Sequence, residues 1–138
     1  MQIREMNLKE LDTVYEVLSH LRDNLSFKEF DDLVYDMRHM EYTMIGVFQR
    51  GELVTYAGVA VQTTFVHKRH LVVFDLVTKK SERRKGYAKE MLSYLQMYAK
   101  SAMCTAIVLQ DSLENEATKL FLQKQEFLPI SKDFVKKL

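Results

Sequence analysis

The chain of 138 residues and 16.3 kDa has the usual length of a single domain. Its composition, 47% apolar and 28% charged with four glycines and one proline, excludes disordered, collagen-like and linker-rich chains. No apolar run reaches the ~18 residues of a membrane helix, and a single cysteine predicts a reducing, cytoplasmic compartment. The net charge of +1 includes ten acidic and five basic side chains in residues 1–41, but two acidic and eight basic ones in residues 66–89. We therefore expect one intracellular domain over residues 1–138, with an acidic first segment and a basic middle.

The first half of the chain predicts one strand, two helices and three further strands. Residues 2–6 are typical of a short strand, and apolar side chains at helical spacing predict a helix over residues 8–22. Ser26 and Glu29 have the spacing of a capping box, which predicts the start of a second helix. The apolar face of this second helix consists of Phe30, Leu33, Val34 and Met37. The three strands that follow cover residues 43–49, 53–66 and 71–78.

The second half predicts two more helices and completes an α/β fold, one mixed sheet with helices packed on it, in the order β-α-α-β-β-β-α-β-α-β. After a polar loop over residues 79–84, the most regular apolar face of the chain predicts a helix. That face consists of Ala88, Met91, Leu92, Leu95, Ala99 and Ala102. Residues 105–109 are apolar on both faces, which favours a central strand, and residues 127–138 alternate enough for one or two closing strands. Between them, Asn115 is a good N-cap for a helix whose inward residues are Ala117, Leu120 and Phe121.

The passage from strand to helix within residues 71–92 carries the strongest functional signal. Arg83, Arg84, Lys85 and Gly86 stand directly before the predicted helix. Free N–H groups at a helix N-terminus, a small residue and nearby positive charge together form a cradle for a diphosphate. The segment lacks the Gly-Lys-Ser/Thr ending of a P-loop and the three glycines of a dinucleotide fingerprint. Because the charge is confined to one turn, we do not expect nucleic acid as the partner.

Two motifs lie in an order and at a separation that make them more specific together than either is alone. The first is Asp75-Leu76-Val77 followed by Arg83-x-x-Gly86-x-Ala88, and the second is Asn115-Glu116-Ala117-x-x-x-Phe121-x-x-Lys124-x-x-Phe127. With the order of the elements, these motifs make essentially the whole chain resemble the GNAT superfamily of N-acetyltransferases. The resemblance implies transfer of an acetyl group from the cosubstrate acetyl-CoA to a primary amine of a small molecule or peptide, without a metal.

The resemblance also implies which residues bind the cofactor. Backbone groups of Leu76, Val77 and Thr78 would pair with the pantetheine arm, and the Asn115 side chain would contact the cofactor. The start of the following helix would hold the pyrophosphate, through Arg83, Arg84, Lys85, Gly86, Tyr87, Ala88 and Lys89. Backbone N–H groups near Leu76 and Val77 would stabilise the oxyanion that forms when the amine attacks directly.

Two departures from the family pattern concern the last predicted helix and the turn after it. Leu122 stands where many members have a tyrosine that protonates the leaving thiolate, and Glu126 replaces a glycine. Water or another side chain can supply that proton, because a thiolate whose thiol has a pKa of about 8.5 is a tolerable leaving group. The loss of the tyrosine also motivates an alternative function, a catalytically silent acyl-CoA-binding domain of the same fold.

Asp75 is the first candidate for the general base that an attacking amine requires. It is a charged residue in an apolar strand, and burial makes a carboxylate more basic. The alternative role for it is a structural carboxylate that bonds neighbouring backbone. His20 and Asp23 lie where the resemblance places the acceptor-binding loop, although a histidine at a helix end is more often structural.

The remaining residues that carry chemistry have simpler interpretations. Asp31 and Asp32 suit the solvated face of the second helix, or an acidic mouth that attracts a cationic amine. His67 and His70 flank a turn between strands without further ligands, which disfavours a metal site. Cys104 is typical of a small, buried apolar residue. The resemblance makes a homodimer plausible and leaves the acceptor amine open.

Overall fold

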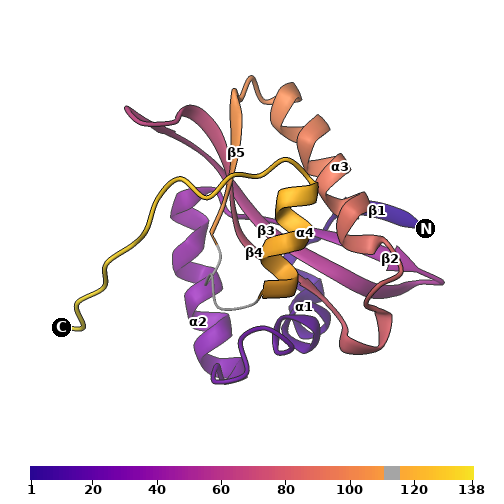
Figure 1. Ribbon diagram of the computed structural model, residues 1–138. Helices are drawn as coiled ribbons and strands as arrows, with labels where there is room; N and C mark the ends of the chain where they lie inside the picture. The colour runs from indigo at the N-terminus through magenta and orange to yellow at the C-terminus, as the bar shows by residue number, and fades with distance from the viewer. Residues whose placement is uncertain (111–115) are drawn as a thin grey trace.

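The computed structural model describes residues 1–110 and 116–138, and contains one mixed sheet with helices on both faces (Figure 1). The strands are β1 (Gln2–Glu5), β2 (Thr43–Gln49), β3 (Glu52–Thr64), β4 (Lys68–Thr78) and β5 (Ala106–Leu109). The helices are α1 (Leu11–Leu18), α2 (Phe27–Met37), α3 (Tyr87–Ser101) and α4 (Glu116–Lys124). Strands β1 to β4 pair antiparallel in chain order, and β5 pairs parallel with β4. This arrangement confirms the predicted α/β fold class. None of the described helices is long and apolar enough to cross a membrane.

Each face of the sheet buries its own cluster of apolar side chains. Helix α3 covers one face, where the cluster includes Ile45, Val59, Leu71, Val73, Met91 and Leu95. Helices α1 and α2 cover the other face, where the cluster includes Val14, Val17, Phe30, Met44, Tyr56 and Val77. Because β3 is covered on both faces, its sequence is a nearly continuous apolar run rather than a strict alternation.

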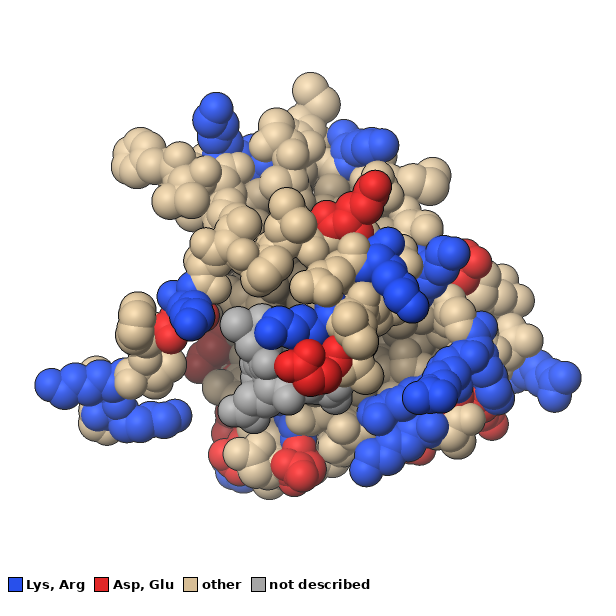
Figure 2. Space-filling view, viewed as in Figure 1, with Lys and Arg blue, Asp and Glu red and all other residues tan. Residues whose placement is uncertain are grey.

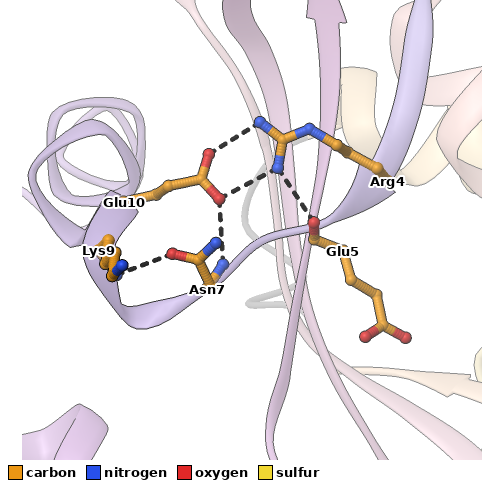
Figure 3. Close-up of polar contacts among 5 residues, drawn as sticks. All are labelled: Arg4, Glu5, Asn7, Lys9 and Glu10. Atoms are coloured by element: carbon orange, nitrogen blue, oxygen red, sulfur yellow. Dashed lines mark hydrogen bonds and ion pairs between the residues drawn. The ribbon is translucent and has the colours of Figure 1, made fainter.

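A network of polar side chains fixes the turn that leads into α1 (Figure 3). The Asn7 side chain accepts a hydrogen bond from the Lys9 N–H at 2.9 Å, and Glu10 Oε1 accepts one from the Asn7 N–H at 3.1 Å. Arg4 of β1 donates to both Glu10 oxygens, at 3.0 and 2.8 Å. The Arg4 guanidinium thereby lowers the pKa of the Glu10 carboxyl and ties this turn to the edge of the sheet.

The predicted capping box of the second helix is confirmed, whereas the first helix is shorter than predicted. Ser26 Oγ accepts a hydrogen bond from the Glu29 N–H at 3.2 Å, and Glu29 Oε1 accepts one from the Ser26 N–H at 3.3 Å. The segment predicted as one helix over residues 8–22 is a short 3-10 turn (Leu8–Glu10) followed by α1. The chain after α1 forms turns, from which Arg22 reaches β4.

Three predictions for the last third of the chain are wrong. Strand β5 is an edge strand of the described sheet, not a central one, because its described pairing is with β4 alone; Ala106 is exposed and its other side chains are only half-buried. In α4, Ala117 and Leu120 are exposed rather than inward. Residues 127–138, all of them described, contain no strand, and Figure 1 shows this tail running away from the sheet.

Candidate active site

Strand β4 has a β-bulge at Phe74. Neighbouring residues of β3 lie opposite Val73 and Asp75, so Phe74 has no opposite residue. The extra residue reverses the alternation of side chains along β4: Val73 belongs to the cluster under α3, whereas Val77 belongs to the cluster under α1 and α2. The bulge therefore turns the Asp75 side chain to the face covered by α1 and α2. Without the bulge, Asp75 would lie on the same face as Val73.

Strands β4 and β5 separate where this bulge begins. Their parallel pairing ends at Val73 and Leu109, followed by one bond from the Gln110 N–H to the Val73 carbonyl at 3.1 Å. From Leu76 to Thr78, β4 is paired with β3 on one side and with no described strand on the other. Such a separation leaves backbone groups available to an extended ligand that binds like an added strand.

The direction of the backbone groups on β4 follows from the bonds at its end. The Lys79 N–H donates to a β3 carbonyl at 2.9 Å, and the Thr78 carbonyl faces away from β3, where it accepts from Arg83 Nε at 3.1 Å. Because these groups alternate in an extended strand, the Leu76 and Thr78 N–H groups face the open side. The Val77 N–H faces β3. Of the two residues from which an oxyanion donor was predicted, Leu76 has the N–H that points to the separation.

The start of α3 lies at the same end of β4. Gly86, which immediately precedes α3, has a left-handed φ of 87°, and Arg84 has one of 64°. A Cβ at Gly86 would meet no atom within 4 Å, so the left-handed φ rather than crowding favours glycine there. The N–H groups of the first turn have no acceptor within the helix. Lys and Arg side chains gather at the lower right of Figure 2, where Figure 1 shows the loop between β4 and α3.

The other residues predicted to hold the pyrophosphate follow in this loop and in the first turn. Lys85 pairs with Glu82, with 2.8 Å between Nζ and Oε2, and is exposed. Tyr87 packs against the cluster under α3, Ala88 is half-buried and Lys89 is exposed. The structure therefore brings these positions together at one helix start, beside the open side of β4.

Asp75 lies at the centre of a network of four side chains. Its Oδ1 accepts from Arg22 Nε at 3.2 Å and Nη2 at 3.1 Å, and its Oδ2 accepts from the Tyr42 hydroxyl at 2.8 Å. The Tyr42 and Tyr56 hydroxyls are 2.8 Å apart. Burial raises the pKa of both tyrosines, so both keep their protons. A carboxylate only accepts, so Tyr42 donates to Asp75 and Tyr56 donates to Tyr42. Asp75 is 9% exposed, which confirms its predicted burial.

A cavity of 240 Å³ adjoins this network. Its apolar lining consists of Leu18, Leu25, Phe30, Leu33, Val34 and Met37, and its polar lining of Arg22, Asn24, Tyr42, Tyr56 and Asp75. The apolar face predicted for the second helix therefore lines a cavity in part, instead of closing a core, and Leu33 is 43% exposed.

Sequence reasoning found Asp75 but missed the residues around it. Tyr42 and Arg22 lie 33 and 53 positions before Asp75, so no local pattern connects them. Gly58 of β3 is also required, because a Cβ there would overlap the Tyr42 hydroxyl and ring. A glycine inside an apolar strand indicates that another group approaches the backbone closely, and Gly58 is the sequence signal that could have indicated this network.

The remaining candidates lie outside this network. His20 Nδ1 accepts a hydrogen bond from the Lys80 N–H at 3.1 Å, which ties the end of α1 to the loop before α3. Asp23 is exposed, and Leu122 is half-buried and lines a wider groove between α4, β4 and β5. Asn115 lies outside the described residues.

Three further residue groups have structural surroundings. The His67 and His70 rings pack with centroids 5.2 Å apart, and Cys104 is half-buried against the cluster under α3. Asp31 and Asp32 are exposed. Over residues 1–110 and 116–138, no group of three or more His, Cys, Asp or Glu side chains is placed to hold a metal ion.

The sequence as a whole matches a known family. The model of the acetyltransferase (GNAT) family matches residues 8–127. The chain belongs to the GNAT acetyltransferase family. The resemblance carried by its motifs is thus confirmed. A relative among curated proteins, the uncharacterized N-acetyltransferase YhdJ of Bacillus subtilis (strain 168), is 27% identical over 116 residues, which are 82% of this chain and 81% of YhdJ.

Solved GNAT structures superpose on the whole chain. The aminoglycoside N-acetyltransferase AAC(6')-Iy in complex with CoA gives a TM-score of 0.86 at 15% identity, over 99% of this chain and 93% of that one. A ribosomal-protein-alanine N-acetyltransferase from Brucella melitensis biovar Abortus 2308 gives 0.83 at 16% identity, over 100% of both chains. An acetyltransferase from Trypanosoma brucei gives 0.80 at 22% identity, over 99% of both. At these identities the likeness establishes the fold.

Proposed function

We propose that the protein transfers the acetyl group of acetyl-CoA to the nitrogen of a primary amine, on a small molecule or a peptide. The observation that carries this proposal is the separation of β4 from β5 at the Phe74 bulge, at the end of β4 that leads to the open start of α3. An extended arm that ends in a diphosphate needs both features, an unpaired strand side and a helix N-terminus with positive charge. Family membership and the CoA-bound relative AAC(6')-Iy support the same cosubstrate.

The residues present fit acetyl-CoA. Leu76 and Thr78 offer N–H groups on the open side of β4, and the first turn of α3 offers further N–H groups at Gly86. Arg84 adds positive charge at the start of α3, while Gly86, two residues later, has no side chain that would obstruct a ligand. When bound, acetyl-CoA supplies an acyl group activated as a thioester. We assign the Leu76 N–H as the hydrogen-bond donor to the thioester oxygen, which becomes negative during transfer. Val77, which pairs with β3, holds the Leu76 N–H in position.

Asp75 is the residue that we assign to the amine. An ionised carboxylate has about four acceptor positions, and Arg22 and Tyr42 occupy three of them. Oδ2 therefore keeps one acceptor position for the amine N–H. The amine nitrogen adds to the thioester carbonyl, whose oxygen becomes negative, and the C–S bond then breaks. One proton leaves the nitrogen toward Asp75, and the thiolate takes one from water, because Leu122 has none to give. The hydroxide left by that water takes the proton from Asp75.

Calorimetry with CoA, followed by thiol release from acetyl-CoA across a panel of amines, tests this function. We expect tight binding of CoA and amine-dependent thiol release. Absence of binding to folded protein would overturn the proposal. The Leu122 position favours a second candidate, a silent acyl-CoA-binding domain. Tight CoA binding with no amine raising thiol release above background would establish that candidate instead.

A further inference from the structure

The cavity beside Asp75 is lined by apolar side chains that the fold leaves partly uncovered. Leu33 and Val34 of α2, with Leu25 before it, line the cavity together with the buried Phe30. Single exposed apolar side chains are common, and this chain has others such as Leu8 and Met97, but apolar side chains that together line a concave space are typical of a binding site. Here they surround 240 Å³ next to a carboxylate, so they form the walls of a binding cavity.

The size of the cavity limits what it holds. An apolar cavity of about 150 Å³ is large enough to bind benzene. A cavity of 240 Å³ therefore has room for one aromatic ring or one branched aliphatic group with a short linker.

The polar groups of the cavity are gathered mainly at Asp75. Arg22 and Tyr42 both donate to this carboxylate, and Tyr56 donates to Tyr42, while Asn24 is the other polar residue of the lining. The wall formed by Leu33 and its neighbours has no polar side-chain atoms. A hydroxyl placed against that wall would lose water without gaining a partner.

We propose that the acceptor is a primary amine carried on a single aromatic or branched aliphatic group, with that group in the cavity and the nitrogen at Asp75. The inference rests on the proposed acetyl transfer and narrows it to one acceptor class. It also sets this chain apart from the aminoglycoside N-acetyltransferase AAC(6')-Iy.

Thiol release from acetyl-CoA tests the acceptor class. The amines compared are phenethylamine and isoamylamine, which carry one apolar group, and glucosamine, which carries several hydroxyl groups. We expect kcat/KM for phenethylamine to exceed that for glucosamine about a hundredfold. Glucosamine as the equal or better acceptor would overturn the inference and leave acetyl transfer standing. If CoA itself does not bind, both proposals fall.

Two matched variants test the position of the apolar group. Leu33→Gln places an amide in the cavity wall, and Leu120→Gln makes the same change on an exposed position of α4 that does not line the cavity. We expect Leu33→Gln to weaken phenethylamine binding to CoA-saturated protein about tenfold by calorimetry, with CoA affinity unchanged. Leu120→Gln should change neither. Equal phenethylamine affinity in the two variants would overturn the placement.

Discussion

The hydroxyl of Tyr42 links the Asp75 carboxylate to the Tyr56 hydroxyl. It donates to Asp75 Oδ2 and accepts from Tyr56, both at 2.8 Å. Tyr42→Phe keeps the ring and removes the hydroxyl, which leaves two buried polar groups with one partner fewer each. We expect the free energy of unfolding in urea to fall by about 1–3 kcal/mol.

Tyr35→Phe is the matched control for that change. Tyr35 is 60% exposed, and the contact it makes, beneath the Arg38 guanidinium at 3.6 Å, uses the ring and not the hydroxyl. Its loss of stability should stay within about 0.5 kcal/mol. Equal losses in the two variants would show that the hydroxyl of Tyr42 does not stabilise the network.

The candidate site was predictable from the sequence only where one residue carries its own signal. Asp75 is a charge in an apolar strand, and Gly86 stands at a helix start, so both were found. Tyr42, just before β2, and Arg22, in the turns after α1, reach Asp75 because the sheet places β2 and β4 on either side of β3 and because Phe74 is bulged. No local pattern specifies a bulge, so the face to which Asp75 points was not predictable.

At the scale of elements, the sequence predicts where a helix starts better than it predicts how the elements pack together. The Ser26 capping box is a contact between near neighbours, and α2 starts there. β5 was predicted as central because it is apolar on both faces, but it lies at the edge of the described sheet, half-buried, and lines a groove together with α4. An apolar run predicts that a strand is buried, but it does not predict which element covers the strand.

The turn before α1 gives a prediction about pH. Arg4 lowers the folded-state pKa of Glu10 below its ordinary value of 4.5. A lowered carboxyl pKa contributes stability that is present above pH 4.5 and is lost as the pH falls through the folded value. We expect Glu10→Gln to lower the Tm at neutral pH, and the difference from the unchanged protein to shrink below about pH 4. A difference that is constant from neutral to acid pH would contradict this.

The start of α3 gives a second prediction at this scale. Gly86→Glu adds a negative side chain where we place the pyrophosphate, and like charges in contact cost several kcal/mol, or about a hundredfold in CoA affinity. Gly51→Ala is the control, because Gly51 also has a left-handed φ, 78°, with no atom within 4 Å of a new Cβ. It should lower stability by backbone strain and leave CoA affinity unchanged. Folded Gly86→Glu protein with unaltered CoA affinity would refute the assignment.

Over the whole molecule, a near-zero net charge results from two segments of opposite sign. The basic segment folds so that its loop between β4 and α3 gathers positive side chains on one face (Figure 2). The proposed amine cavity lies elsewhere, between α1, α2 and the sheet, and its walls are mainly apolar. The two ligands should therefore be held by different forces, charge at one site and apolar contact at the other.

Salt separates these two forces in one experiment. The distance over which charges interact in solution falls from about 10 Å at 0.1 M salt to about 3 Å at 1 M. We expect CoA affinity, measured by calorimetry, to fall about tenfold between these concentrations, because its phosphates lie against the basic loop. Pantetheine has the same arm without phosphates, and its affinity should not fall. Phenethylamine binding to CoA-saturated protein should hold or strengthen, since salt does not weaken apolar contact. Equal salt dependence for CoA and pantetheine would show that the basic loop does not bind the phosphates.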